Sequence, residues 1–458
     1  MSHVPRQLSL GAFLHPSGHH VAAWRHPDAQ ADAGVNLANY VRLARLAEAA
    51  KFDLVFLADQ VAIPSTDLDY VGRTTRAALF EPLTLISALA AATRNIGLVA
   101  TVSTSFNRPY NLARQFASLD HISQGRSGWN LVTSGSSLEA QNFGPLDGYG
   151  EHALRYERAR EYADVVRRLW DSWEDDAVVA DKASGQFSLP GKVHALNHRG
   201  THFDVAGPLS VPRSPQGRPV QVQAGSSPAG RDLAAYSAEA VFTAQQTLAD
   251  AQEFYGDVKA RAQAYGRDAD SIRILPGAFI VTGASESEAR DKFQALQDLV
   301  HPVVGLNYIQ THLGGVDLSG YPLDGPVPET LPATEGNKSR QALLLELARR
   351  KRLTIRELYL EIAGARGHWQ LVGTPAEIAD ALETCFREGG ADGFNIMPPS
   401  PTGLDDFVQL VLPELRRRGL FRHEYGGRTL RDHLGLKRPA FGSSFATRSA
   451  KATAVPHS

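Results

Sequence analysis

Residues Pro219–Arg231, PVQVQAGSSPAGR, combine a short strand, a turn of small residues and the start of a helix. The expected strand is Val220–Gln223, the turn is Gly225–Ser227, and Pro228 suits the first position of a helix. The free N–H groups of a helix start, together with two hydroxyls, can hold a phosphate, although this composition is also typical of an ordinary capped helix. In a parallel barrel, the turn would lie at the end where chemistry takes place.

The rest of the chain repeats the order of strand and helix. The expected strands are 8–14, 54–57, 96–101, 129–132, 220–223, 240–243, 274–282 and 393–397. Besides the helix that Pro228 opens, helical segments follow at 39–51, 81–93, 111–122, 156–173, 248–265, 286–300 and 404–418. Continuous apolar runs are typical of parallel strands that are buried on both faces. Eight such units predict an α/β fold, a (β/α)8 TIM barrel with insertions, over an open doubly wound sheet, and no GxGxxG follows the first strand.

The chain is longer than a bare barrel, which needs about 250 residues, because it has 458. We expect one barrel domain over 1–441, with insertions near 60–79, 174–218 and 301–367, and a disordered tail over 442–458. Within the insertions, 200–206 resembles a strand and 341–351 an amphipathic helix. Long insertions in a barrel usually build the substrate pocket and its lid.

The composition is that of an ordinary globular protein, with 43% hydrophobic and 21% charged residues. A net charge of −2 offers no basic field for nucleic acid or an anionic membrane. No run reaches the roughly 18 apolar residues that a spanning helix needs. The single cysteine, Cys385, excludes an internal disulfide and a cysteine-rich zinc site, and it favours a reducing, cytoplasmic compartment.

The side chains expected just past the strand ends are mostly neutral and polar. They include His15, Asp59, Thr104, Asn130, Ser226 and Ser227. One carboxylate without a second argues against glycosidase-type acid and base pairs, and no lysine is present there for a Schiff base. This set suits a cofactor held by hydrogen bonds better than it suits a metal ion.

Histidines form two further groups of candidates. His152 and Tyr156 are four residues apart and share one helix face, where they can donate to a phosphate or simply lie on the surface. The cluster HPSGHHVAAWRHP (15–27) lacks carboxylates and no HExxH occurs, which disfavours metal and leaves one imidazole to line a pocket. His312, in the long insertion, can serve as an acid, a base or a hydrogen-bond donor, or can simply be exposed.

Taken in order, these segments resemble a known family. The motifs are GH…WRHP, FLAD, STSFNRPYNLARQFASLDHIS, GRSGWNLVTS, EHALRYERAREY, QAGSSPAGR and GADGFNIMP. They are similar to the bacterial-luciferase-like flavin monooxygenases, in the branch of the nitrilotriacetate, dibenzothiophene-sulfone and long-chain alkane monooxygenases. The similarity extends from about Leu8 to Pro439.

The resemblance implies a two-component enzyme that receives reduced FMN (FMNH2) from a separate NAD(P)H-dependent flavin reductase. With O2 it would form a flavin C4a-hydroperoxide and insert one oxygen atom into a small organic substrate whose identity the motifs do not fix. It also implies a homodimer or homotetramer. A metal-dependent barrel hydrolase and a non-catalytic flavin-binding protein stand as alternatives.

The resemblance also implies a role for each candidate residue. Asp59, Thr104 and Asn130 would lie near the flavin ring, His152, Tyr156, Ser226 and Ser227 would hold the phosphate, and His19 and His312 would be catalytic on the substrate side.

Overall fold

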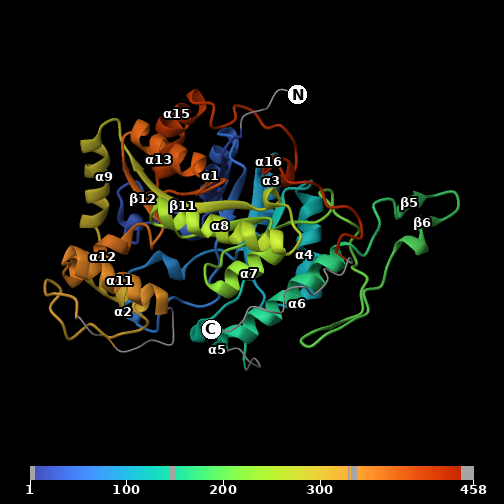
Figure 1. Cartoon of the computed structure of the whole chain (residues 1–458), viewed down its shortest axis with the longest axis horizontal. Helices are drawn as coiled ribbons and strands as arrows, with labels where there is room; N and C mark the ends of the chain where they lie inside the picture. The colour runs from blue at the N-terminus through green and yellow to red at the C-terminus, as the bar shows by residue number, and fades with distance from the viewer. Residues whose placement is uncertain (1–5, 145–150, 329–330, 332–337, 445–458) are drawn as a thin grey trace.

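Eight parallel strands close into a barrel in a computed structural model that describes residues 6–144, 151–328, 331 and 338–444 (Figure 1). The barrel strands are β1 (Ser9–Phe13), β2 (Leu54–Leu57), β3 (Gly97–Ser103), β4 (Ser127–Val132), β9 (Val220–Gln223), β10 (Ala240–Thr243), β11 (Arg273–Thr282) and β13 (Gly393–Met397). The ladder between Ser9 and Gly393 joins β1 to β13, and β10 pairs with β11, so the ring has no open edge. The predicted (β/α)8 barrel is confirmed.

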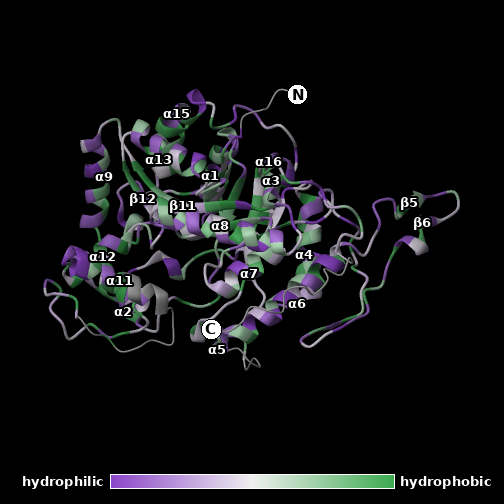
Figure 2. Cartoon of the chain, in the orientation of Figure 1, coloured by the Kyte–Doolittle hydropathy of each residue, from purple (hydrophilic) through white to green (hydrophobic). Residues whose placement is uncertain are grey.

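Helices cover the outside of the barrel. In chain order they are α1 (Leu37–Ala49), α3 (Pro82–Ala92), α4 (Pro109–Ile122), α6 (His152–Trp170), α7 (Pro228–Ser237), α8 (Leu248–Ala264), α9 (Glu286–Asp298), α13 (Pro375–Arg387), α14 (Gly403–Asp406), a π-turn (Phe407–Val411) and α15 (Leu412–Arg417). Most begin at a capping side chain; the Ser285 hydroxyl, for example, accepts from the Glu288 N–H before α9. Polar residues colour the outer helices, and the barrel strands are mostly apolar (Figure 2).

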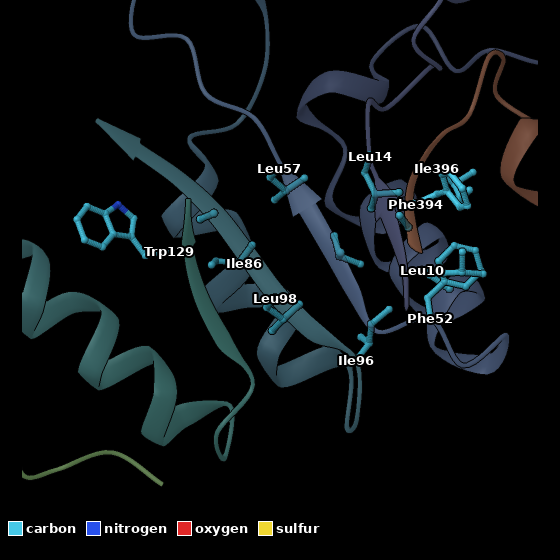
Figure 3. Packing of buried hydrophobic residues seen from close by; sticks show 14 of the residues in the cluster. Leu10, Leu14, Phe52, Leu57, Ile86, Ile96, Leu98, Trp129, Phe394 and Ile396 are labelled. Atoms are coloured by element: carbon cyan, nitrogen blue, oxygen red, sulfur yellow. The ribbon is translucent and has the colours of Figure 1, made fainter. Parts of the chain in front are cut away.

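The core has two layers because successive strand residues point to opposite sides of the sheet. Leu10 and Phe394 belong to the outer layer, which also contains the helix residue Ile86, and Figure 3 shows Leu10 and Phe394 close to Phe52. Phe13 and Phe56 face inward, with their ring centroids 5.0 Å apart. Aromatic side chains thus form part of the inner layer, together with aliphatic ones such as Val99 and Leu430.

Two predicted elements are wrong in detail, and one strand was not predicted. Residues 200–206 do not form one strand, because β7 (His198–Arg199) and β8 (Asp204–Val205) pair across a turn. The predicted helix 404–418 is interrupted by the π-turn, since Pro413 has no N–H to continue the ladder. The unpredicted β12 (Trp369–Gly373) pairs with the last residues of β11, outside the ring.

The insertion 301–367 contains α10 (Pro302–His312), α11 (Lys338–Lys351) and α12 (Ile355–Ala363). The predicted helix at 341–351 is therefore present within α11. These helices share a small apolar core of their own, which includes Tyr70 from the other insertion, where α2 (Leu68–Val71) and a 3-10 turn (Thr75–Ala77) lie. The third insertion sends out the hairpin β5 (Val178–Asp181) and β6 (Gln186–Ser188), which stands away from the barrel (Figure 1). None of the described helices is long and apolar enough to cross a membrane.

The segment around α16 (Leu430–His433) closes the opposite end of the barrel from the insertion helices (Figure 1). Leu430 packs with the apolar side chains inside the barrel. The buried Arg431 donates to both oxygens of Glu239 at 2.7 and 2.8 Å. Burial raises the pKa of Glu239, but Arg431 and Arg218 outweigh burial and bring the pKa down to about 2. The predicted tail lies, from residue 445 on, outside the described residues.

Candidate active site

The turn after β9 has the geometry of an anion seat. Ser227 is the N-cap of α7, because its hydroxyl oxygen accepts from the Gly230 N–H at 3.1 Å, and Pro228 follows as the first helical residue. The turn is tight: a Cβ on Gly230 would come within 2.9 Å of the Gly225 backbone. Pro228 has no N–H, and the Gly230 and Arg231 N–H groups are bonded to Ser227, so among these first residues the Ala229 N–H is left beside two hydroxyls, those of the exposed Ser226 and of Ser227.

Helix α6, which carries two more of the predicted residues, runs parallel to α7. Arg160 pairs with Asp232 at 3.3 Å, and Tyr236 donates to Asp164, so both contacts join residues 72 positions apart. The same offset places Tyr156 level with the start of α7. The ring centroids of Tyr156 and His152 are 4.8 Å apart, so the two side chains share one face of α6.

Asn130 lies on β4 and points into the barrel, because its neighbours on the strand belong to the outer layer. Its amide nitrogen donates to the Thr101 hydroxyl at 2.8 Å, and that hydroxyl donates to the Leu57 carbonyl. Within the described ranges, the buried amide oxygen of Asn130 has no hydrogen-bond partner. A buried polar atom of this kind indicates a missing ligand or water.

Thr104 and Asp59 follow β3 and β2, as predicted. The Thr104 hydroxyl donates to the Val132 carbonyl at 3.2 Å, and the Thr104 carbonyl accepts from Arg158 of α6 at 2.6 Å. Asp59 is half-buried, and burial raises its pKa to about 6, with Glu81 and Glu139 adding to the rise. This carboxyl therefore changes charge near physiological pH.

His19 is fully buried, and hydrogen bonds engage both of its ring nitrogens. Nε2 donates to the Phe13 carbonyl at 2.8 Å, so Nδ1 is the acceptor, and it receives a hydrogen bond of 2.6 Å from Arg366. Burial, followed by the charge of Arg366, holds the pKa of His19 well below its usual value. The imidazole is neutral at physiological pH and has one fixed tautomer.

The neighbouring histidines show no metal site. Burial lowers the pKa of His20 to about 4, and its Nε2 contacts the Gln297 side chain at 3.0 Å. Across the ranges that the structure describes, no three His, Cys, Asp or Glu residues are grouped to hold a metal ion.

His312 ends α10, where sequence analysis had identified only a long insertion. Its Nδ1 donates to the Tyr308 carbonyl one turn earlier at 2.7 Å. The two rings pack with centroids 4.3 Å apart. This interaction turns the imidazole back along its own helix.

A cavity of about 320 Å³ opens at the barrel mouth, and Ser226 and His312 both line it. Its wall also includes Arg76, Tyr308, Arg366 and His368, which sequence analysis did not single out. The ring of His368 stacks on Phe242, with centroids 5.0 Å apart and an interplanar angle of 18°. The one signal for these residues was their place in or beside the predicted insertions. The other seven predicted site residues do not line this cavity.

Comparisons with known proteins agree with this architecture. A family model described as luciferase-like monooxygenase matches residues 18–393. The chain is 51% identical to the N-acetyl-S-(2-succino)cysteine monooxygenase of Bacillus subtilis (strain 168), over 96% of this chain and 99% of that protein. It is 50% identical to nitrilotriacetate monooxygenase component A of Aminobacter aminovorans, over 95% and 97% of the two chains. A crystal structure of riboflavin lyase with modified FMN and its substrate riboflavin is 34% identical, covers 95% of this chain and 97% of its own, and superposes with a TM-score of 0.83.

Proposed function

The chain belongs to the luciferase-like monooxygenase family, and from this premise we propose that it is the oxygenase component of a two-component system that consumes reduced FMN. The observation that carries the proposal is the anion seat at the start of α7, with Tyr156 of α6 at the same level. A phosphate bound there would direct the rest of the flavin toward the barrel mouth.

The residues present fit FMN. The Ser226 and Ser227 hydroxyls, with Tyr156 and His152, would hold the phosphate through charge-assisted hydrogen bonds. The unpartnered amide oxygen of Asn130 is an acceptor that suits an N–H donor at the edge of a flavin ring. Two findings support this cofactor: the riboflavin lyase that superposes well on this chain contains a modified FMN, and the buried polar oxygen lies inside the barrel.

When bound, reduced FMN supplies two of the four electrons that reduce O2, and the substrate supplies the other two. One oxygen atom enters the substrate and the other leaves as water, so each turnover uses one reduced FMN, one O2 and one substrate. The barrel residues bind and orient the reactants, and Phe13 and Phe56 fill the barrel beneath them. Helices α10 and α12 of the insertion would help to exclude water from the mouth.

Asp59 and His312 are the groups that we propose to manage protons at the mouth. The pKa of Asp59 is raised to about 6 by burial, so the carboxyl can hold or release a proton near neutral pH. His312 lines the cavity itself, and we propose that it acts on the substrate there. We propose that His19, whose two nitrogens are engaged, acts on the substrate side through Arg366.

A separate reductase would supply the reduced flavin. The Aminobacter relative is named as component A of its monooxygenase, which supports a system of more than one protein. The expected assembly into a dimer or tetramer is a further proposal, which light scattering tests.

The test is a titration of the full chain with photoreduced FMN under anaerobic conditions, followed by mixing with oxygen. We expect saturable binding of reduced FMN and, with a reductase and NADH, oxygen-dependent turnover of an organic substrate. Failure to bind reduced FMN would contradict the proposal. The two relatives are named for different substrates, so the family alone does not fix the substrate of this chain.

A further inference from the structure

The polar wall of the mouth cavity is positively charged. Arg76 and Arg366 both line it, and no carboxylate from the described ranges is among its lining residues. Two guanidinium groups in a partly dry cavity attract an anion strongly, because the low local dielectric weakens screening. A cavity of about 320 Å³ is within the range of pockets that take small ligands.

His19 holds both arginines in place from beneath the cavity. Its Nδ1 accepts from Arg366 at 2.6 Å, and its backbone carbonyl accepts from Arg76 at 3.2 Å. The third contact, from Nε2 to the Phe13 carbonyl, anchors the ring to β1. Arg76 and Arg366 come from different insertions, so a single buried residue sets their spacing.

The cavity offers a further donor. The guanidinium of Arg76 lies over the Tyr308 ring, 5.6 Å from its centroid. The Tyr308 hydroxyl is buried, and it has no hydrogen-bond partner within the described part of the chain. Tyr308 is only 4% exposed and lines the cavity, so this hydroxyl is available to a ligand there. Two guanidiniums and a phenol are a donor set that matches a carboxylate.

We propose that the organic substrate is a small carboxylic acid whose carboxylate binds between Arg76 and Arg366, with His19 as the positioning residue for both. This inference rests on the proposed monooxygenase function and deepens it by naming the substrate class. The flavin phosphate is the competing occupant, since Ser226 also lines the cavity. We assign the pair to the substrate because the other three residues of the proposed phosphate seat, His152, Tyr156 and Ser227, do not line the cavity, and because the arginines lie on the insertions and not on the barrel turns.

The experiment compares acids with their esters. The probes are thiodiacetate, iminodiacetate and nitrilotriacetate, each paired with its methyl ester, and binding to the full chain is followed by ligand-observed NMR. We expect at least one acid to bind about tenfold or more tightly than its ester, as expected for loss of a charge-assisted hydrogen bond. If every acid binds no better than its ester, the proposal is overturned, and this comparison needs no variant.

Variants then separate the substrate from the flavin. Arg76→Gln and Arg366→Gln should each weaken acid binding about tenfold, while FMN affinity, read from fluorescence quenching, stays within twofold. Arg76→Lys should restore part of the acid affinity because it keeps the charge without the bidentate fork. With a substrate acid, the loss should appear in KM more than in kcat.

The outcomes distinguish the two proposals. If the arginine variants bind FMN more weakly and bind the acid as tightly as before, Arg76 and Arg366 bind the flavin phosphate. That result would refute the inference about the substrate and would still agree with the proposed function. If the chain binds an acid through the pair but never binds reduced FMN, the proposed function falls and the anion site stands alone.

Discussion

Replacing the two serines of the turn after β9 one at a time separates effects on FMN affinity from effects on the stability of the fold. Ser227 caps α7 at 3.1 Å from the Gly230 N–H, so Ser227→Ala removes both a helix cap and a proposed phosphate donor. Ser226 is exposed and is not the capping residue of α7, so Ser226→Ala removes a proposed phosphate donor alone. The matched control is Ser285→Ala, which removes an equivalent cap, 3.2 Å from the Glu288 N–H, at α9.

The magnitudes follow from these contacts. A hydrogen bond to a charged phosphate contributes about 1.5–3 kcal/mol, which corresponds to a loss of FMN affinity of roughly tenfold to a hundredfold. Loss of a serine cap costs about 1 kcal/mol of stability. We therefore expect Ser226→Ala to weaken FMN binding without changing the melting temperature, Ser285→Ala to lower the melting temperature only, and Ser227→Ala to do both.

Fluorescence quenching of FMN and an anaerobic titration with photoreduced FMN measure affinity, and thermal unfolding without flavin measures stability. The reasoning is refuted if both turn variants bind FMN as tightly as the unmodified chain. It is also refuted if Ser285→Ala weakens FMN binding as much as Ser227→Ala, because the effect would then be general destabilisation.

Three further predictions concern other buried or half-buried groups. Because burial raises the pKa of Asp59 from 3.8 to about 6, the folded state keeps this proton to a higher pH than the unfolded chain, and stability falls as pH rises between these values. Asp59→Asn should flatten that fall when thermal unfolding is measured from pH 4 to 7. An unchanged pH profile would contradict the raised pKa of Asp59. His19→Phe should weaken acid binding about tenfold. The control is His433→Phe, which removes a similar buried contact with the Asn95 carbonyl at the other end of the barrel and should leave acid binding unchanged. Equal losses of acid affinity in the two variants would show a general effect on the fold. Glu239→Gln should lower the free energy of unfolding by about 3–5 kcal/mol at pH 7, because it leaves Arg431 buried without its counter-charge. The difference in stability between the variant and the unmodified chain should shrink as pH falls from about 4.5 toward 2, where Glu239 itself becomes protonated. A difference that stays constant over this pH range would argue against the pairing of Glu239 with Arg431.

The barrel was predictable because its signals are local. Runs such as Val220–Gln223 are buried on every residue, and small residues mark the turn that follows. β12 escaped prediction because its residues are mostly half-buried and show no alternation of polar and apolar positions. The π-turn before α15 escaped because Pro413 shifts the hydrogen-bond ladder without ending the helical segment.

The candidate site was predictable only where it lies on the barrel turns. Ser226 and Ser227 follow a strand, so their position could be derived from spacing. Arg76 and Arg366 reach the mouth through the packing of two insertions, and no periodic pattern in either insertion indicates this. His19 illustrates the same limit, since its neutral, fixed state depends on Arg366, which lies 347 positions along the chain.

The pairing of Ser9 with Gly393 has a consequence for how the protein acquires its ligand. A ring closed by strands from distant parts of the chain pays a large loop-closure entropy and is expected to form late in folding. The mouth belongs to that ring, so the flavin site that we propose would be complete only once the last ladder has formed. Flavin would then stabilise only the closed state, by mass action, and would not speed the earlier steps. In a refolding experiment, the recovery of flavin binding should therefore lag behind the recovery of helical signal and report closure of the ring.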